Sequence, residues 1–402
     1  MKRICLVVVG LFINLLGAFS QVNDSAVYRP RKLSVEEIHF VSSYYHQEGN
    51  NSAVTGGTGT EKLTDYSNSF EVKMLKYNKR NRKVELEANL GIDYYTSASS
   101  DKIDPSTVSS ASSRDLRIYP SVTGKIINES DGSSVSAGLS YSHESDYRSY
   151  GTAAGFSQKS EDRSREFSVK GQFYFDHVKI ILPYEMRTPA TGGLWGAPNQ
   201  YRYPWRSRKT LSTSFSLSQV VNQRLQLMWL LDLAYQHGYL GLPFHRVYLK
   251  NGGLTNERLP SSRLKVPVGM RVNYFAGDKL VLRSFYRFYL DDWGLKAHTA
   301  EAEVSLKLNP FFSITPFYRY YTQTGIDYFA GNGEHYSNEK FYSSNYDLSK
   351  FNSHFFGAGW RFAPSKGLFG KKHWNMIEVR YGHYRRSTGL HANIISLHLK
   401  YK

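Results

Sequence analysis

A glycine-rich stretch near the N-terminus is the first candidate for chemistry in this sequence. Gly56-Gly57-Thr58-Gly59 could cradle an anion through backbone N–H groups. No helical pattern follows the stretch, so a loop folded into the interior of the protein is favoured over a phosphate-binding loop. Glu61 and Asp65 lie just beyond it and could bind a cation, although solvated loop carboxylates are the simpler interpretation. We therefore expect an inward-folding loop at this position.

A short acidic stretch is the second candidate. Asp291-Asp292 with His298 offers hard oxygen ligands and an imidazole, a set that suits a metal ion. The sequence favours the alternative, a polar outer loop whose Trp293 packs at a membrane interface. Serine, histidine and aspartate are numerous enough for a hydrolase triad, but there is no G-x-S-x-G motif and the 13 histidines are scattered. We expect no catalytic residue, no metal and no cofactor.

The elements that must position such residues are strands. The final stretch alternates between an apolar face (Ile395, Leu397, Leu399, Tyr401) and a polar face (Ser396, His398, Lys400, Lys402). A period of two is the signature of a strand with one apolar and one polar side. Such a strand with an aromatic near its end resembles the closing strand of a bacterial outer-membrane barrel. The edge strand of a soluble sandwich is the alternative.

The composition fits a membrane barrel. Aromatic residues make up 15% of the 402 residues, while the mean hydropathy is only -0.47, as expected when every second strand residue is apolar. No run of 18 apolar residues follows the N-terminus, so helical membrane spans are not expected. The formal net charge is +17, but the basic residues are scattered without a pure Lys/Arg block, so we expect no nucleic-acid partner.

The first twenty residues have the pattern of a cleaved signal peptide. Lys2 and Arg3 precede an apolar run, and small residues at Ala18 and Ser20 suit cleavage. Loss of the two basic residues lowers the formal charge from +17 to about +15 (17 − 2). Cys5 lies in the apolar run, so the mature chain has no cysteine. We divide the chain into a signal peptide (1–20), a polar lead (21–34) and a barrel domain (35–402) that is exported to the outer membrane of a Gram-negative cell.

The connections between alternating segments predict an all-β, antiparallel, up-and-down transmembrane barrel. Short links would be periplasmic turns (78–82, 128–132, 176–177, 221–223, 276–278, 309–311 and 364–374). Long links would be outer loops (47–66, 97–114, 145–164, 188–208, 237–262 and 323–351). This order gives about sixteen strands, or fourteen if the weakly patterned strands near 38–45 and 178–184 are absent. Tyrosines near strand ends (Tyr94, Tyr141, Tyr235, Tyr274, Tyr320 and Tyr401) predict aromatic girdles.

Charged residues occupy the face that would not meet lipid. The candidates for lining the lumen are Glu85, Glu87, Arg271, Arg283, Arg287, Glu301, Glu303, Arg319, Glu378 and Arg380. A basic side chain on the lipid face would cost about 2–4 kcal/mol at the bilayer midplane, whereas a wet lumen tolerates it. We expect ion pairs between neighbouring strands, for example between Arg283 and the strand that bears Glu301 and Glu303.

Several stretches resemble the domain-of-unknown-function family 3570. They are 43–65, which is similar to an N-terminal hallmark of the family, 95–101, 108–113, 238–240, 246–248, 289–294 with His298, and 319–323. The resemblance extends over nearly the whole mature chain and is weakest at about 145–210. It implies an outer-membrane barrel without an agreed activity. It also implies an association with a small lipoprotein, a thioredoxin-like protein and a flavin transferase, and hence a periplasmic redox partner.

Three classes of function remain open. The first is a porin-like channel or transporter, which Arg271, Arg283, Arg287 and Arg319 would bias toward anions. The second is a plugged barrel whose aromatic loops 188–208 and 323–351 hold a lipoprotein or another envelope partner. The third, and least favoured, is an outer-membrane enzyme. In each case the lipid bilayer is the expected environment.

Overall fold

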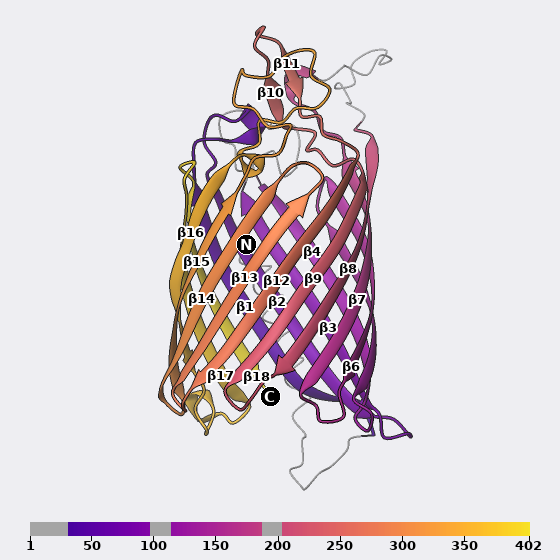
Figure 1. Ribbon diagram of the computed structural model, residues 1–402, viewed down its shortest axis with the longest axis vertical. Helices are drawn as coiled ribbons and strands as arrows, with labels where there is room; N and C mark the ends of the chain where they lie inside the picture. Colours follow the sequence, from indigo (N-terminus) through magenta and orange to yellow (C-terminus); the bar gives the residue numbers. More distant parts are fainter. Residues whose placement is uncertain (1–30, 97–113, 187–202) are drawn as a thin grey trace, which may run out of the picture.

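Sixteen antiparallel strands close into one barrel in the computed structural model, which describes residues 31–96, 114–186 and 203–402 (Figure 1). The strands are β1 (Ser34–Glu48), β2 (Leu63–Tyr77), β3 (Lys83–Thr96), β4 (Arg114–Asn128), β5 (Ser133–His143), β6 (Tyr147–Lys159), β7 (Arg165–Lys179), β8 (Trp205–Val220), β9 (Leu225–Gly238), β12 (Ser262–Ala276), β13 (Leu280–Asp291), β14 (Lys296–Asn309), β15 (Phe312–Gln323), β16 (Phe351–Phe362), β17 (Trp374–Arg386) and β18 (His391–Tyr401). A separate hairpin, β10 (Arg246–Tyr248) with β11 (Leu254–Asn256), lies between β9 and β12. The all-β barrel and its strand number confirm the prediction.

The last strand closes the barrel on the first. β18 pairs with β1 from Ile38↔Tyr401 to Glu48↔His391, and on its other side with β17. Closure gives every strand two hydrogen-bonded neighbours and removes the exposed edge that a sandwich would leave. The weakly patterned first strand is therefore present. The alternative interpretation of the last strand, as the edge strand of a soluble sandwich, is wrong.

Three long connections lie at one end of the barrel, and most of the tight turns lie at the other (Figure 1). Tight turns such as 277–279 and 310–311 close one end. The links 49–62, 239–261 and 324–350 lie at the other end, which we call the outer end. The predicted alternation of short and long links therefore holds for most of the chain. The proposed signal peptide (1–20) and most of the polar lead lie outside the described residues, as do residues 97–113 and 187–202, which include parts of two predicted outer loops.

One part of the strand assignment is wrong. The segment 145–164, predicted to be an outer loop, contains β6, and the predicted turn 176–177 lies inside β7. Both faces of β6 carry small or polar residues, so its alternation is weak: Ser149, Gly151, Ala153 and Ser157 share one face. Asp176 looks like a turn residue, yet it accepts hydrogen bonds from Ser149 and Arg208 inside the barrel. The predicted total of sixteen is still correct because the two errors cancel: β6 was missed, and the separate strand predicted at 178–184 does not exist.

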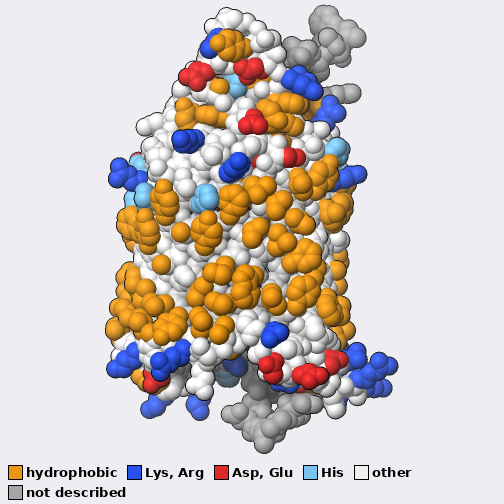
Figure 2. Space-filling view, in the orientation of Figure 1, with side chains coloured by type: hydrophobic (Ala, Val, Ile, Leu, Met, Phe, Trp, Pro, Cys, Tyr) orange, Lys and Arg blue, Asp and Glu red, His pale blue; other side chains and the backbone are white. Residues whose placement is uncertain are grey.

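An apolar belt crosses the outside of the barrel on the face shown in Figure 2, and exposed large apolar residues occur on other strands as well. Outward residues at alternate positions are large and exposed, among them Val135, Leu139, Leu211, Leu233 and Ile395. Tyr235 and Tyr274 are exposed near the last residues of two antiparallel strands and hence near opposite ends of the barrel, in agreement with aromatic girdles. Within the described ranges, no helix is apolar and long enough to cross a membrane. The belt is the surface expected of a barrel whose strands cross a bilayer.

This geometry predicts opposite effects at two adjacent positions. Ile395 points outward from the middle of β18 and is 48% exposed, so Ile395→Arg should cost about 2–4 kcal/mol of folding free energy in the bilayer. Ser396 points to the other face, and Ser396→Arg serves as the matched control with little expected loss. Refolding into lipid vesicles, followed by the shift of the unheated protein band on gel electrophoresis, measures both. Equal folding of the two variants would contradict the assignment of faces.

A folded lid and an arginine-lined pocket as the candidate functional site

Three outer loops fold together over the mouth of the barrel, and we call residues 49–62, 239–261 and 324–350 the lid. Backbone hydrogen bonds join Arg258 and Tyr342 in both directions, at 2.8 and 3.1 Å, and Lys250 N–H donates to the carbonyl of His335. The Arg246 side chain donates to the carbonyl of Val54 at 2.7 Å and forms a two-pronged ion pair with Glu185. Val247, His335 and Ser343 are fully buried. The lid is therefore an ordered structure with its own interior.

The glycine-rich stretch is part of the lid. Gly56, Gly57 and Gly59 all have left-handed backbone angles, with φ of 78°, 85° and 89°. Residues other than glycine rarely adopt such angles. The N–H groups of Gly56 and Gly57 donate to the carbonyls of Ala53 and Ser52. These amides are already used, so the anion cradle is not supported. Glu61 accepts a hydrogen bond from the Asn51 N–H, and burial raises the pKa of its carboxyl above the ordinary value.

Gly57 provides a test of this packing. A Cβ atom at Gly57 would lie 2.9 Å from the carbonyl oxygen of Ser344, so Gly57→Ala should combine a backbone cost of about 1–2 kcal/mol with a steric clash. Gly333 also has a positive φ, but open space surrounds it, so Gly333→Ala isolates the backbone cost. We expect limited proteolysis to cut the lid faster in the Gly57 variant than in the Gly333 variant. Equal rates would show that Gly57 is not packed as described.

A buried carboxylate joins two of the lid loops. Glu257 accepts hydrogen bonds from the Ser343 hydroxyl at 2.5 Å and the Leu242 N–H at 2.8 Å. His245 faces it at 3.6 Å. The carboxylate lies between the serine and the histidine, whereas a hydrolase triad needs the histidine in the middle. These groups stabilise the lid and do not form a nucleophile–base pair.

The lid should be stable at neutral pH and open in acid. Burial opposes the charge of Glu257, but His245, the Ser343 hydroxyl and the Leu242 N–H together hold the pKa of its carboxyl below the ordinary value. A lowered folded-state pKa stabilises the fold above the unfolded value of about 4.3, and this contribution disappears as the pH falls through the folded-state pKa. Proteolysis of the lid by an acid-active protease should therefore rise only below about pH 4. Glu257→Gln should abolish this acid step and speed cleavage at neutral pH; an unchanged acid step would contradict the assignment.

The lid is anchored to the barrel by an apolar cluster beside the aspartates that were considered, and not favoured, as metal ligands. Trp293, Leu295, Ala297 and Ile326 are buried together, so Trp293 packs beneath the lid and not at a membrane interface as predicted. Asp291 is buried and accepts from Arg263 at 2.5 Å and from the Trp293 N–H at 3.0 Å. His298 points to the lipid-facing side of β14, beside the Tyr286 hydroxyl. The aspartate and histidine side chains considered as metal ligands therefore do not converge.

A second acidic group lies at the outer end of β4 and the β5–β6 turn. Asp115, Glu144 and Asp146 bring carboxylate oxygens within 4.8 Å of one another. Asp115 already accepts from the Ser145 hydroxyl and Glu144 from the Tyr95 hydroxyl. Burial raises the pKa of the Glu144 carboxyl. The group is explained by these contacts within the fold.

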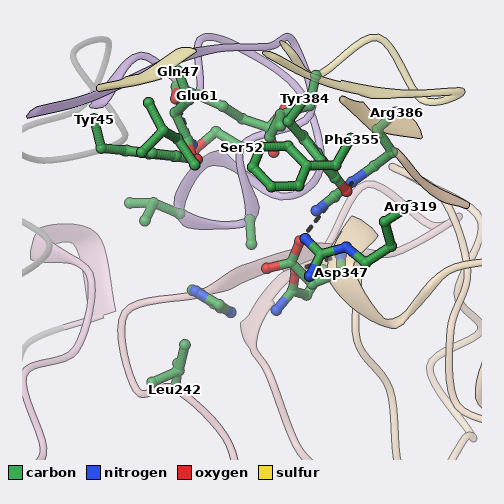
Figure 3. Close-up of a pocket in the computed structure, with 16 residues that line it drawn as sticks. Tyr45, Gln47, Ser52, Glu61, Leu242, Arg319, Asp347, Phe355, Tyr384 and Arg386 are labelled. Carbon is green, nitrogen blue, oxygen red and sulfur yellow. Dashed lines mark hydrogen bonds and ion pairs between the residues drawn. The ribbon is translucent and has the colours of Figure 1, made fainter. Parts of the chain in front are cut away.

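A pocket of about 440 Å³ lies directly beneath the lid, between loop 49–62 and the inner faces of β15–β18 (Figure 3). Arg319 and Arg386 reach it from one side, with Tyr45, Gln47 and Glu61 across the space. The lining also includes apolar side chains: Val54, Leu242, Phe355, Leu390 and Ile394. The pocket thus combines fixed positive charge with apolar surface.

The two arginines of the pocket differ in their partners. Arg386 lies 2.8 Å from Asp347 of the lid and stacks over the Phe351 ring. Arg319 stacks over the Phe355 ring, with its guanidinium carbon 4.9 Å from the ring centre. No carboxylate of the described chain lies within ion-pair distance of Arg319. Arg319 is therefore available to an anionic solute.

Several predicted lumen residues meet in one network on the inner wall. Glu303 contacts Arg283 of the neighbouring strand at 2.5 Å and Arg380 of β17 at 3.0 Å. β15 and β16 lie between β14 and β17, so the second contact spans the concave side of the wall. Glu378 lies 3.8 Å from Arg380. The expected ion pair between Arg283 and the glutamate strand is confirmed.

The remaining predicted lumen residues lie outside this network. Arg271 stacks over Phe285, and Arg287 is in register with Thr299. Glu301 is opposite Arg319 in the β14–β15 register. On β2 and β3, Glu85 pairs with Lys83 at 2.7 Å and Glu87 is opposite Lys73. Asp65, which was grouped with the glycine-rich loop, belongs to β2 and is in register with Tyr45 and Tyr95.

A hydroxyl-lined wall on β5–β9 was missed. Ser134 bonds to Ser157 at 2.8 Å and Ser168 to Ser216 at 2.7 Å across neighbouring strands. The sequence does carry a signal for it, because serines recur at every second position over 212–218, on the face opposite the lipid-facing residues. The inner wall thus has a strongly charged part (β12–β18 and β1–β3) and a part on β5–β9 where hydroxyl side chains are frequent.

Comparison with known proteins gives one family. The model of DUF3570, described as "Protein of unknown function", matches residues 104–392. The motifs at 43–65 and 95–101 precede the matched range. No curated protein matches the chain.

Solved structures similar to this chain include three bacterial proteins. OccAB3 from Acinetobacter baumannii is 10% identical, with 91% of this chain and 98% of that chain covered and a TM-score of 0.40. A BenF-like porin from Pseudomonas fluorescens Pf-5 is 7% identical, with coverages of 93% and 100% and a TM-score of 0.42. The siderophore receptor PirA from A. baumannii is 12% identical, with a TM-score of 0.44; 90% of this chain matches 54% of the receptor, so the chain spans about half of it. Function has to be argued from the residues themselves.

Proposed function

Because the chain belongs to the DUF3570 family of proteins of unknown function, we propose its role from its own geometry: a porin-like channel that carries small organic anions across the outer membrane. The observation that carries this proposal is the pocket under the lid. Arg319 reaches that pocket without a carboxylate partner in the described chain, and Phe355, Leu390 and Ile394 supply apolar contact. A guanidinium binds carboxylate or phosphate oxygens with charge-assisted hydrogen bonds.

The path that we infer has three parts. A solute passes between the lid loops, meets Arg319 and Arg386 in the pocket, and then moves along the wall that bears Arg271, Arg283 and Arg287. Positive charge in a narrow, poorly hydrated passage raises the local concentration of anions and repels cations. Glu303, shared between Arg283 and Arg380, neutralises part of this charge. Weak, multiple sites of this kind let an anion enter and also leave.

Swelling of proteoliposomes tests the proposal. Vesicles that contain the purified protein are placed in solutions of equal osmolarity that contain a small dicarboxylate, a sugar of similar size or the dication of a diamine. We expect the dicarboxylate to enter fastest and the diamine slowest. Equal rates for the three solutes, or fastest entry of the diamine, would overturn the anion channel.

The interlocked lid favours a second candidate. A barrel closed by ordered loops could serve as a platform for an envelope partner, such as the small lipoprotein or redox protein that the family resemblance implies. Side chains at the top of the lid, including Tyr336 and Lys250, are in contact with each other and exposed. Co-purification of a stoichiometric envelope protein with wild type, lost in Tyr336→Ser with Lys250→Ser, would support the platform. A purified barrel that carries no partner but conducts anions would exclude the platform and leave the anion channel as the remaining candidate.

A further inference from the structure

A short motif recurs at the outer ends of the strands and has no part in the proposed channel. An aromatic residue is followed two positions later by histidine in β1, β5, β7, β9 and β17, at Tyr44–His46, Tyr141–His143, Phe175–His177, Tyr235–His237 and Tyr381–His383. In each case the histidine is among the last four residues of its strand. Five of the 13 histidines thus lie near the outer ends of their strands.

These histidines continue the lipid-facing rows. In β9, Leu231, Leu233 and Tyr235 are exposed at alternate positions, and His237 is the next member of that row. The rings of Tyr235 and His237 are stacked at 6.4 Å, and those of Tyr141 and His143 at 6.2 Å. Figure 2 shows histidines and basic side chains along the upper edge of the apolar belt. That edge is the level at which lipid headgroups begin.

On β5–β9 the motif combines with basic residues into one patch. The register places Arg148 of β6 between His143 and His177, and Lys209 of β8 beside His237. We call these five residues the basic patch. Arg148 stacks over the Trp205 ring at 5.1 Å, an arrangement that holds a guanidinium at a surface. Among the described residues, no carboxylate forms an ion pair with Arg148 or Lys209.

Two further histidines show which ring nitrogen can donate a hydrogen bond to a lipid headgroup. His298 and His354 each have Nδ1 2.7 Å from a tyrosine hydroxyl, that of Tyr286 and Tyr318 respectively. When the hydroxyl donates to Nδ1, the neutral ring carries its proton on Nε2, on the side away from the tyrosine. The tyrosine thereby fixes which nitrogen can donate to an oxygen in the headgroup layer.

We propose that the basic patch binds the phosphate groups of lipids in the outer leaflet, beside the lid. Phosphate oxygens are the chemical match for a guanidinium, an ammonium and imidazole N–H donors that lie close together on neighbouring strands. Lipid is the source of the phosphate because the patch is on the outside of the barrel, at the upper edge of the apolar belt. The belt below it holds the acyl chains of the same lipid molecule.

Native mass spectrometry of the purified full-length barrel tests this. The protein is released from detergent after incubation with lipid A, with dephosphorylated lipid A or with inorganic phosphate. We expect lipid A to bind, and its affinity to fall at least about tenfold when the phosphates are removed or in Arg148→Gln/His177→Gln/Lys209→Gln, since each basic group near an anionic headgroup contributes substantially. Lys79→Gln/Arg80→Gln, in the turn at the opposite end, should bind lipid A as wild type does.

Three results would overturn the proposed lipid site. Equal affinity of wild type for lipid A and for its dephosphorylated form would show that acyl chains alone are recognised. Undiminished lipid A binding by the folded triple variant would place the phosphate elsewhere. If the triple variant does not fold, the comparison of the two lipids on wild type still decides. Binding of inorganic phosphate as tight as that of lipid A would identify a free-anion site and contradict the lipid assignment.

Discussion

Arg319→Glu is expected to lower the preference of the channel for anions about tenfold or more, because a unit charge a few ångströms from a solute changes its energy by a few kcal/mol at an effective dielectric constant of about 20. Arg319 is the pocket arginine without a carboxylate partner in the described chain. The substitution therefore changes the field in the pocket without removing an ion pair of the fold. Ion selectivity of single channels, measured from reversal potentials, reports the change.

The control for this variant is Lys170→Glu, which makes the same change in net charge on the β7 wall. Lys170 is in register with Gly155 and Ser214 on the part of the wall that carries serine and glycine. We expect a much smaller loss of anion preference there. Equal losses in the two variants would mean that total charge, and not the pocket, determines selectivity.

Excision of the top of the lid should give the largest change in conductance. Phe329 and Ser343 lie beside each other as a parallel β-bridge, so a flexible Gly/Ser linker that is long enough to turn the chain back can replace Ala330–Tyr342. The excision removes the bridges to Leu249 and Arg258 but leaves Ile326 in the apolar cluster and Asp347 beside Arg386. Since the lid narrows the entrance, we expect the conductance to rise about twofold or more.

A matched excision separates the lid from loop length in general. Shortening the inner link 364–372 between β16 and β17 should leave the conductance unchanged, because that link lies at the other end of the barrel. If the lid excision left conductance unchanged while the protein folded, the restriction would lie deeper in the lumen. If both excisions raised it equally, the lid would have no special role.

Sequence periodicity was sufficient for the barrel but not for every strand. Strands with a large apolar residue at every second position, such as β9 and β18, could be placed from the sequence because one face must meet lipid. β6 could not, because glycine, alanine and serine fill one face while Thr152 and Ala154 interrupt the large residues of the other. Asp176 and His177 were mistaken for a turn, since polarity alone does not separate a turn from the end of a strand with a polar inner face.

The types of residue in the candidate site could be predicted from the sequence, but their arrangement in space could not. The sequence indicated inward charges and an inward loop at 56–59, and the Arg283–Glu303 pair followed from strand order. The lid was not predictable, because it depends on contacts between residues far apart, such as Arg246 with Val54 and Ser343 with Glu257. Trp293 was misplaced for the same reason: its burial depends on Ile326, which belongs to another loop.

The zero-current potential of wild-type protein in a planar lipid bilayer, under a gradient of potassium chloride, tests the central claim most directly. An arginine-lined path under the lid predicts a potential of the sign that marks chloride as the more permeant ion, and a smaller potential when the salt concentration is raised and screens the fixed charges. A potential of the opposite sign, or a folded barrel that passes no current at any voltage, would contradict the anion channel.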